Sequence, residues 1–345
     1  MPKIKIRRDT SVNLATTVAD LGEPVYETDL KELKIGDGVN QLKDIDSVDF
    51  AGKASFNRLY KGVDLSVKFA TEIAQFADIY AWLENRKNTG NFRGINVGDY
   101  FTFSITAGTC GGYTILPQTF KARIIGLNTY KNCGDTPIGN MIYFKTDEVI
   151  DTPIKWNPTD NNNGTSVQKN PWLASAAYAI LNGVNNYSTS AYQSAAHGAN
   201  AAGAGILQLL PSSLRSKLKQ KRNILDERYS SSGLLTGGTG WSWADMGQLW
   251  LPNEIEVYGC GIRSDRCLTQ GFWFPESGLS IQFPWFANNC ENRISYKSDG
   301  SRCNWWLSAA ASHYSTAVCI VDSYGIAGYI TATYATIYLP LCFCI

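Results

Sequence analysis

The chain has 345 residues, a formal net charge of +1 and nine cysteines. So small a net charge gives no reason to expect nucleic acid or an anionic membrane as a partner, and so long a chain can bury a large core without disulfides or a metal. An odd number of cysteines with no zinc-type spacing predicts free, mostly buried thiols, synthesis in a reducing compartment, no metal and no cofactor.

Residues 1–50 are predicted to form a separate small β module. Polar and apolar residues alternate over 3–8, which is typical of a half-buried strand, and the sequence predicts two more strands at 25–29 and 34–38. No secretory signal is expected, because this end lacks an apolar stretch, and no apolar run is long enough for membrane insertion. A hairpin of this size is marginal alone, so it needs packing partners, and self-association is the simplest source.

Residues 51–66 are predicted to be a linker, and 67–345 a second domain that begins with a helix. Apolar residues keep helical spacing over 55–87, best over 69–86, before the stop at Asn88-Thr89-Gly90. Further elements are predicted at these places: strands at 100–105 and 120–125 around a turn at 108–112, a helix at 171–182 capped by Asn170, and a helix at 207–222 with a solvated basic face.

Two irregular segments raise a metal or a catalytic residue as alternatives. Residues 160–164 hold Asp160 among asparagines and a glycine, but one carboxylate does not make a calcium cage, so a loop is predicted. Residues 184–205 are rich in Asn, Ser, Ala and Gly and contain His197, which predicts an inserted surface flap rather than a site. Trp241, Trp243 and Trp250 are predicted to fill a core.

The last forty residues have an unusual composition. Window 308–337 contains seven Ala and four each of Ser, Thr, Tyr and Ile, and it lacks Lys, Arg, Glu, Gln, Pro, Leu, Met, Phe and Trp. Patches of alternation at 317–321 and 329–334 predict short strands, with turns at Gly325 and Gly328. Small residues with tyrosine favour an adaptable contact surface, while the alternative is an ordinary β-meander that closes the fold.

The run from Trp305 to Ile345 resembles the variable region of proteins diversified by retroelements, relatives of phage tropism determinants with a C-type-lectin-like fold. The framework stretches at 231–259, 170–182 and 282–294 resemble the same family. In that family, miscopied template adenines scatter asparagine codons, which cannot yield the Lys, Glu, Gln, Met and Trp that the window lacks. The resemblance implies an α+β fold with a C-type-lectin-like C-terminal domain at 67–345, a variable region at about 305–345, and fixed scaffold tryptophans at Trp305 and Trp306.

A second resemblance concerns residues 7–38, where RRDT and GEPVYETDLKELKIGDG are similar to the attachment repeat of phage tail-fibre and tail-tip proteins. Together the resemblances imply a phage receptor-binding protein (an adhesin) that is located on the virion after synthesis in the bacterial host cytoplasm. They also imply a homotrimer, a phage tail component bound through the N-terminal module, and a host-cell surface receptor, protein or glycan.

The expected ligand-binding residues project from one face of the window. Tyrosines supply contact area at low entropic cost, polar residues supply selection, and isoleucines supply apolar contact. The predicted set is Ala311, His313, Tyr314, Ala317, Ile320, Asp322, Ser323, Tyr324, Ile326, Gly328, Tyr329, Ile330, Thr333 and Tyr334.

No enzyme is predicted. There are two histidines, no nucleophile elbow and no phosphate-binding glycine loop. Formylglycine-generating enzymes share the broad lectin-like fold, but Cys342 and Cys344 lie in an expected closing strand. The sugar-binding calcium motifs of lectins are also absent, with Pro252-Asn253-Glu254 in a strand-like context. The alternatives to host binding are a structural tail protein and a calcium-independent lectin.

Overall fold

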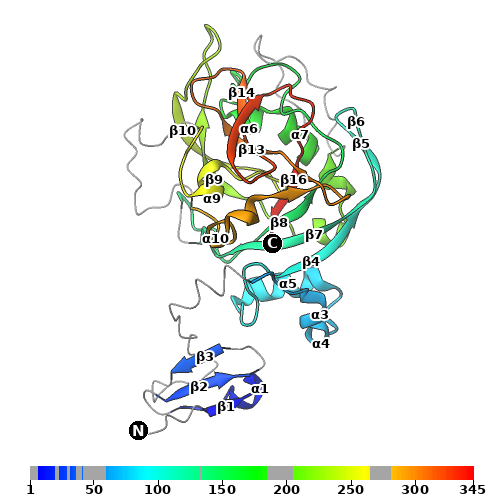
Figure 1. The fold of residues 1–345 in the computed structure, drawn as a ribbon, viewed down its shortest axis with the longest axis vertical. Helices are drawn as coiled ribbons and strands as arrows, with labels where there is room; N and C mark the ends of the chain where they lie inside the picture. The colour runs from blue at the N-terminus through cyan, green and yellow to red at the C-terminus, as the bar shows by residue number, and fades with distance from the viewer. Residues whose placement is uncertain are drawn as a thin grey trace. The chain divides into compact units, whose positions relative to one another are not determined.

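The computed structural model describes residues 7–19, 23–28, 32–35, 41, 60–131, 134–184, 205–264 and 281–345. Its contacts divide the chain into two compact units, Met1–Tyr60 and Lys61–Ile345, and each is described by itself. The predicted linker residues 51–59, most of the flap at 184–205 and the turn at 36–38 lie outside the described residues. The structure is α+β, mostly sheets with short helices, as predicted. Figure 1 shows both units.

The N-terminal unit is a three-stranded sheet in the order β1 (Arg7–Asp9), β2 (Pro24–Glu27) and β3 (Glu32–Ile35). β1 runs parallel to β2, and β3 runs antiparallel to it. A helix that the sequence did not predict, α1 (Ser11–Leu14), supplies Leu14 to a small core with Ala19 and Val25. So small a core supports only marginal stability.

The C-terminal unit is built on one large sheet in the order β12-β11-β8-β7-β4, with β16 paired to β8. Its strands are β4 (Tyr100–Ile105), β7 (Gln118–Leu127), β8 (Ile142–Val149), β11 (Ser295–Tyr296), β12 (Arg302–Cys303) and β16 (Pro340–Cys344). The predicted strands at 100–105 and 120–125 are confirmed as β4 and part of β7. β16 is buried along its whole length, so the C-terminus lies inside the fold.

A smaller sheet carries the window, in the order β13 (Trp305–Ala310), β14 (Ala317–Val321) and β15 (Ala327–Thr331). The strand predicted at 317–321 is confirmed as β14, whereas the one predicted at 329–334 begins and ends earlier, as β15. Gly325 turns the chain at φ +82°, but Gly328 lies within β15, so no turn occurs there. Two hairpins complete the strands: β5 (Gly108–Cys110) with β6 (Tyr113–Ile115), and β9 (Arg222–Glu227) with β10 (Gly240–Asp245).

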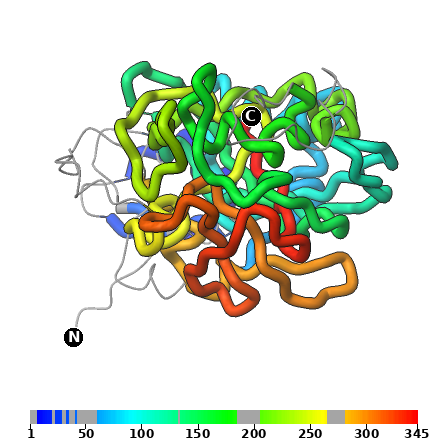
Figure 2. Tube along the Cα trace, turned by 90° about the horizontal axis from the view of Figure 1, so that it is seen from above, coloured from blue at the N-terminus to red at the C-terminus, as the bar shows by residue number. Residues whose placement is uncertain are grey.

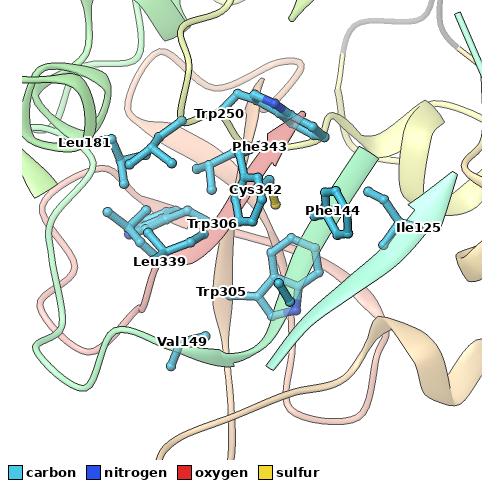
Figure 3. Close-up of a cluster of buried hydrophobic side chains, with 14 of the residues drawn as sticks. Ile125, Phe144, Val149, Leu181, Trp250, Trp305, Trp306, Leu339, Cys342 and Phe343 are labelled. Carbon is cyan, nitrogen blue, oxygen red and sulfur yellow. The ribbon is translucent and has the colours of Figure 1, made fainter. Parts of the chain in front are cut away.

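The two sheets share one hydrophobic core, whose centre is drawn in Figure 3. Phe343 of β16 stacks on Phe144 of β8 with ring centroids 5.2 Å apart. Trp305 and Trp306 of β13 are fully buried, and their indole N–H groups donate to the carbonyls of Arg293 (2.9 Å) and Ile154 (2.8 Å). Both tryptophans are therefore part of the buried core.

The helices are short, and two long ones predicted from the sequence are wrong. The helical elements are α3 (Leu65–Lys68), α4 (Ala70–Ile73), α5 (Ile79–Thr89), α6 (Pro171–Ala174), α7 (Ala176–Asn182), η2 (Ile206–Leu209), α8 (Ser212–Arg215), α9 (Glu254–Tyr258), α10 (Pro284–Asn288) and η4 (Cys290–Arg293). Asp78 ends the run expected over 69–86 by taking an extended conformation and capping α5. Gly90 ends α5 in a left-handed conformation, as predicted.

The helix expected over 207–222 breaks at Leu210, which is extended before Pro211, and Arg222 already begins β9. Its expected basic face is not a solvated one, since Lys221 is buried. Likewise Ser175 interrupts the helix at 171–182, because its hydroxyl caps α7 by accepting from Tyr178 N. Among the described residues, no helix is both long enough and apolar enough to cross a membrane.

Candidate functional site

Residues 311–316, between β13 and β14 in the window, form a loop that the framework holds through main-chain atoms. Arg228 is fully buried, and its guanidinium donates to the carbonyl oxygens of Ala311 (2.9 Å) and Tyr314 (3.0 Å). The buried Asn162 side chain donates to the carbonyls of Tyr314 (2.8 Å) and Ala317. His313 N donates to Thr236 O (2.8 Å). These bonds fix the loop whatever side chains it carries.

Residue 313 has a constrained backbone within this loop. His313 has φ +64°, in the left-handed region that few residues other than glycine adopt. Its side chain is exposed. The loop therefore presents this side chain outward from a fixed conformation that β-branched side chains adopt only with strain.

The hairpin between β14 and β15, residues 322–326, is held in a similar way. Asn304 accepts from Ser323 N (2.8 Å), and the Tyr258 hydroxyl donates to Gly325 O (3.3 Å). One window side chain takes part, because Asp322 accepts from the main-chain N–H groups of Tyr324 (2.9 Å) and Ile326 (2.8 Å). Asp322 therefore shapes the turn, in addition to any contact with a ligand.

Large side chains project from the loop, the hairpin, the edge strand β15 and the segment that follows β15. Tyr324 and Ile326 are the most exposed, at 73% and 61%, followed by Tyr314 at 45%, Tyr334 at 44% and Tyr329 at 38%. We call these five residues and His313 the exposed rim. In Figure 2 the orange and red loops that follow β12 lie along one edge of the C-terminal unit. The rim is an edge and two connections rather than a sheet face.

Three predicted binding residues are not at the surface, and their assignment to a ligand-binding face is corrected. Ala311, Ala317 and Ile320 are 0%, 3% and 5% exposed. The reason is that β14 is the middle strand of its sheet and is buried along its whole length, while Ala311 at the start of the loop belongs to the hydrophobic core. Ile320 also closes over Gly328, where an added Cβ would lie 3.2 Å from its Cγ1.

The other predicted residues are intermediate. Ser323, Gly328 and Ile330 are half-buried. Thr333 is engaged by the framework, since both its N–H and its hydroxyl donate to Asp160. Asp160 thus has a structural role in the segment predicted to be a loop, and Asn161, Asn162 and Asn163 in the same segment are buried.

Within the rim, Tyr314 and Tyr329 form a stacked pair. Their ring centroids are 4.6 Å apart with 24° between the planes, and the Tyr329 hydroxyl donates to that of Tyr314 (2.9 Å). This hydrogen bond raises the pKa of Tyr314. The exposed guanidinium of Arg263 lies over the Tyr329 ring, 5.6 Å from its centroid. The geometry joins a fixed cation to two window tyrosines.

The sequence did not single out Arg263, because a tertiary contact places it. Buried Glu254 accepts from the N–H groups of Ile262 (2.9 Å), Arg263 (2.8 Å) and Ser264 (2.7 Å) through one carboxylate oxygen. Arg263 O in turn accepts from Ser312 N (2.6 Å). One buried acid thus couples the Arg263 segment to the window loop.

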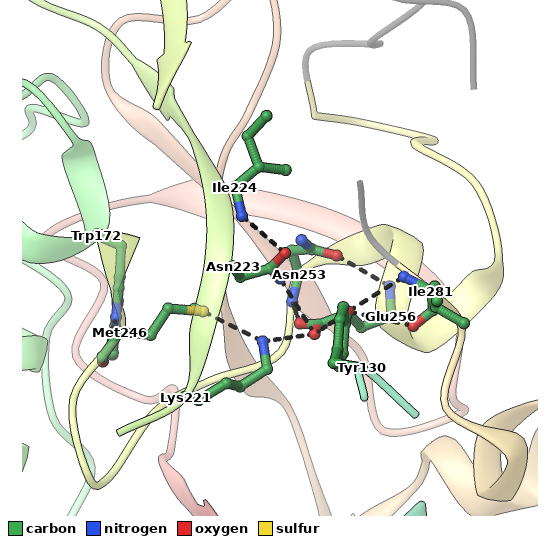
Figure 4. A network of polar contacts seen from close by, with 9 residues as sticks. All are labelled: Tyr130, Trp172, Lys221, Asn223, Ile224, Met246, Asn253, Glu256 and Ile281. Atoms are coloured by element: carbon green, nitrogen blue, oxygen red, sulfur yellow. Dashed lines mark hydrogen bonds and ion pairs between the residues drawn. The ribbon is translucent and has the colours of Figure 1, made fainter. Parts of the chain in front are cut away.

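Glu254 opens α9, and a second buried acid anchors that helix. Glu256 accepts from Lys221 Nζ (2.5 Å) and the Tyr130 hydroxyl (2.5 Å), as drawn in Figure 4. Its other oxygen accepts from Asn253 N, and Asn253 accepts from Glu256 N, which makes a capping box. The strand-like context predicted for 252–254 is therefore wrong, since Asn253 caps a helix. Burial and the neighbouring Glu256 raise the pKa of Tyr130 well above its usual value.

Among the residues that the structure describes, no group of three or more His, Cys, Asp or Glu side chains is arranged to hold a metal ion.

Trp250 is buried, whereas Trp241 and Trp243 are only half-buried in β10. Of the described cysteines, all are free: Cys110, Cys303, Cys319, Cys342 and Cys344 are buried, and Cys260 and Cys290 are exposed. His197 lies outside the described residues.

Two family models match the chain. Residues 4–40 match the major tropism determinant N-terminal domain. This match confirms the predicted similarity to phage tropism determinants, while the lectin-like fold and diversification by a retroelement stay predictions. Residues 157–345, more than half of the chain, match a domain of unknown function, DUF6273. No curated protein and no solved structure matches the chain.

Proposed function

We propose that this chain, which belongs to the DUF6273 family, is the receptor-binding protein of a phage virion. The protein sits at the tail tip or fibre, is attached to a tail component through its N-terminal module, and contacts a host-cell surface receptor with the exposed rim. The similarity of residues 4–40 to the major tropism determinant N-terminal domain supports this role. It acts by binding and not as an enzyme.

One observation carries the proposal. The framework holds loop 311–316 and the hairpin largely through window main-chain atoms, while the rim side chains are exposed. A surface whose support does not depend on its side chains can change them and keep its shape. Such a surface suits a protein whose gene is diversified by a retroelement, as proposed here. Tyrosine-rich surfaces give large contact area at low entropic cost.

We extend the proposal to fold and assembly. The C-terminal unit is a C-type-lectin-like domain, supported by its α+β build and by β16, which returns the chain end to the side of β8. The assembly is a homotrimer, supported by the small core of the N-terminal unit, which gains stability from partners. Three rims would strengthen weak individual contacts by multivalency. Light scattering that finds only monomers at micromolar concentration contradicts the trimer.

The test replaces all six rim residues with serine in assembled phage. We expect adsorption to host cells to fall to background with normal particle yield, because the replaced side chains are exposed and lie outside the hydrophobic core. The matched control replaces three exposed apolar residues outside the window, Val67, Leu116 and Val167, and we expect it to adsorb normally.

The outcomes separate the alternatives. Normal adsorption by the rim variant overturns the proposal. Failure of the rim variant to assemble into particles favours a structural tail protein instead. Binding of the wild-type protein to defined sugars on a glycan array, with the chelator EDTA present, favours a calcium-independent lectin.

A further inference from the structure

We infer that Arg263, with the stacked tyrosines Tyr314 and Tyr329, forms a fixed anion-binding subsite on the exposed rim, which takes a carboxylate of an acidic protein segment on the receptor. The inference rests on the proposed function and adds the chemistry of the bound group. It also adds a specificity-determining residue that lies outside the window.

The first step is the charge itself. The guanidinium is exposed above the Tyr329 ring, and its only described side-chain contact is this ring. No carboxylate among the described residues forms an ion pair with it. The carboxylate of Glu254 is engaged by main-chain N–H groups of 262–264 and by the Ser264 hydroxyl. The N–H groups of Arg263 are therefore available to a ligand.

The second step is preorganisation. Three main-chain bonds to buried Glu254 hold the segment, and stacking on Tyr329 restricts the arginine side chain. An arginine already held in place loses less entropy when it binds. The hydroxyl groups of Tyr314 and Tyr329 lie 2.9 Å apart on the same platform and supply further polar contacts.

The third step is the partner. A guanidinium binds a carboxylate through two parallel N–H···O bonds, which are stronger than neutral hydrogen bonds. Arginine and tyrosine are also the residues most enriched where proteins bind proteins tightly. The strongly exposed Tyr324 and Ile326 on the same rim add apolar contact to this charge. A cation among aromatic and aliphatic groups favours an acidic protein segment over a neutral sugar.

The test compares phage that carry Arg263→Gln, Arg263→Lys or the control Arg302→Gln, a change at an exposed arginine in β12. The readout is binding of phage to intact host cells. Because a charge-assisted pair is lost, we expect Arg263→Gln to weaken binding about tenfold or more. Arg263→Lys should fall between Arg263→Gln and wild type, and Arg302→Gln should match wild type. Circular dichroism of the purified variants checks their folding.

Two further measurements keep the inference testable without any variant. Wild-type binding should weaken as salt rises, because exposed charges are screened. Digestion of surface proteins on the cells by protease should abolish binding, whereas periodate oxidation of glycans should not. Salt-independent binding, or binding lost only after periodate, overturns the inference.

Failure of this inference is distinct from failure of the proposed function. Normal binding by Arg263→Gln, together with lost binding by Tyr314→Ala and Tyr329→Ala, overturns the anion subsite and leaves host recognition standing. Normal binding by all three variants removes the platform from the recognition surface and overturns the anion subsite, and the six-residue rim variant then decides the proposed function.

Discussion

Loop 311–316 of the window and the neighbouring strands β13 and β16 differ in how much their side chains contribute to the fold. Loop 311–316 is held by bonds from Arg228 and Asn162 to its carbonyl oxygens, and it exposes the side chains of His313 and Tyr314. β13 and β16 also pair through main-chain bonds, but their side chains are packed in the core, with Trp306 and Phe343 fully buried. The loop begins at Ala311, directly after the last residue of β13.

The difference teaches where variation is tolerated. A bond to a carbonyl oxygen survives most substitutions, because every residue has that oxygen. A packed side chain does not, since interiors are close-packed and respond to the loss of a single methylene group. The four predictions below test this contrast, from the largest expected effect to the smallest.

The largest effect is expected for Trp306→Ala. Removal of a fully buried indole leaves a cavity and an unpaired Ile154 carbonyl, so the free energy of unfolding should fall by about 3–5 kcal/mol. Urea denaturation followed by circular dichroism measures it. The control is Tyr324→Ala at the exposed rim, with an expected change within about 0.5 kcal/mol. Similar losses in the free energy of unfolding for Trp306→Ala and Tyr324→Ala would contradict the contrast between packed strands and exposed rim.

A smaller loss is expected for Arg228→Ala, which removes the donor to the carbonyls of Ala311 and Tyr314. Bonds from a buried cation are lost and two acceptors lose partners, so we expect about 2–3 kcal/mol less stability. The same denaturation assay applies. Arg228→Lys should recover only part of the lost stability, because an ammonium group cannot reproduce the planar set of N–H donors of the guanidinium. Full stability in Arg228→Ala would mean that the loop does not depend on this support.

Asp322→Ala tests the window side chain with a structural role. Loss of two bonds to Tyr324 N and Ile326 N in a surface turn should lower the free energy of unfolding by about 1 kcal/mol. Ser323→Ala, next to it in the turn, is the control and should change stability by less. Faster hydrogen exchange at residues 324 and 326, measured by NMR, would locate the effect in the turn.

The last prediction concerns reactivity and involves no loss of stability. Burial raises the pKa of Cys342 and Cys344 to about 12, so at about pH 8 almost no reactive thiolate forms in the folded protein. Iodoacetamide should modify the exposed Cys260 and Cys290, and should reach Cys342 and Cys344 only after denaturation. Peptide mapping by mass spectrometry reads the result. Modification of Cys342 in the native protein would show that β16 opens.

Alternation predicted β4, where one face is buried, and β-branched residues favoured a strand at β14, which is buried along its whole length. The helix at 207–222 failed although its leucines keep helical spacing. Leu207, Leu210 and Leu214 are buried by packing, yet Leu210 is extended before Pro211. A bridge from Lys219 to Cys344 then draws the chain alongside β16. Sequence spacing carries no information about such distant pairing.

The candidate site was predicted in part. Tyrosines exposed at the rim follow from the composition of the window, but the burial of Ala311, Ala317 and Ile320 does not. Alanine suits a core and a surface equally, and in a strand buried on both faces the period of two disappears. Arg263 was missed because Glu254 and Ser312 place it through main-chain bonds.

The left-handed backbone at His313 bears on how such a gene evolves. Asparagine, aspartate, glycine and histidine adopt φ +64° with little strain, whereas isoleucine, threonine and valine do so rarely. A mutational process acting on this codon would generate all of these amino acids, yet selection for a folded product would retain the first group. In a library of natural variants, position 313 should therefore show a narrower repertoire than position 324, whose side chain is freely exposed.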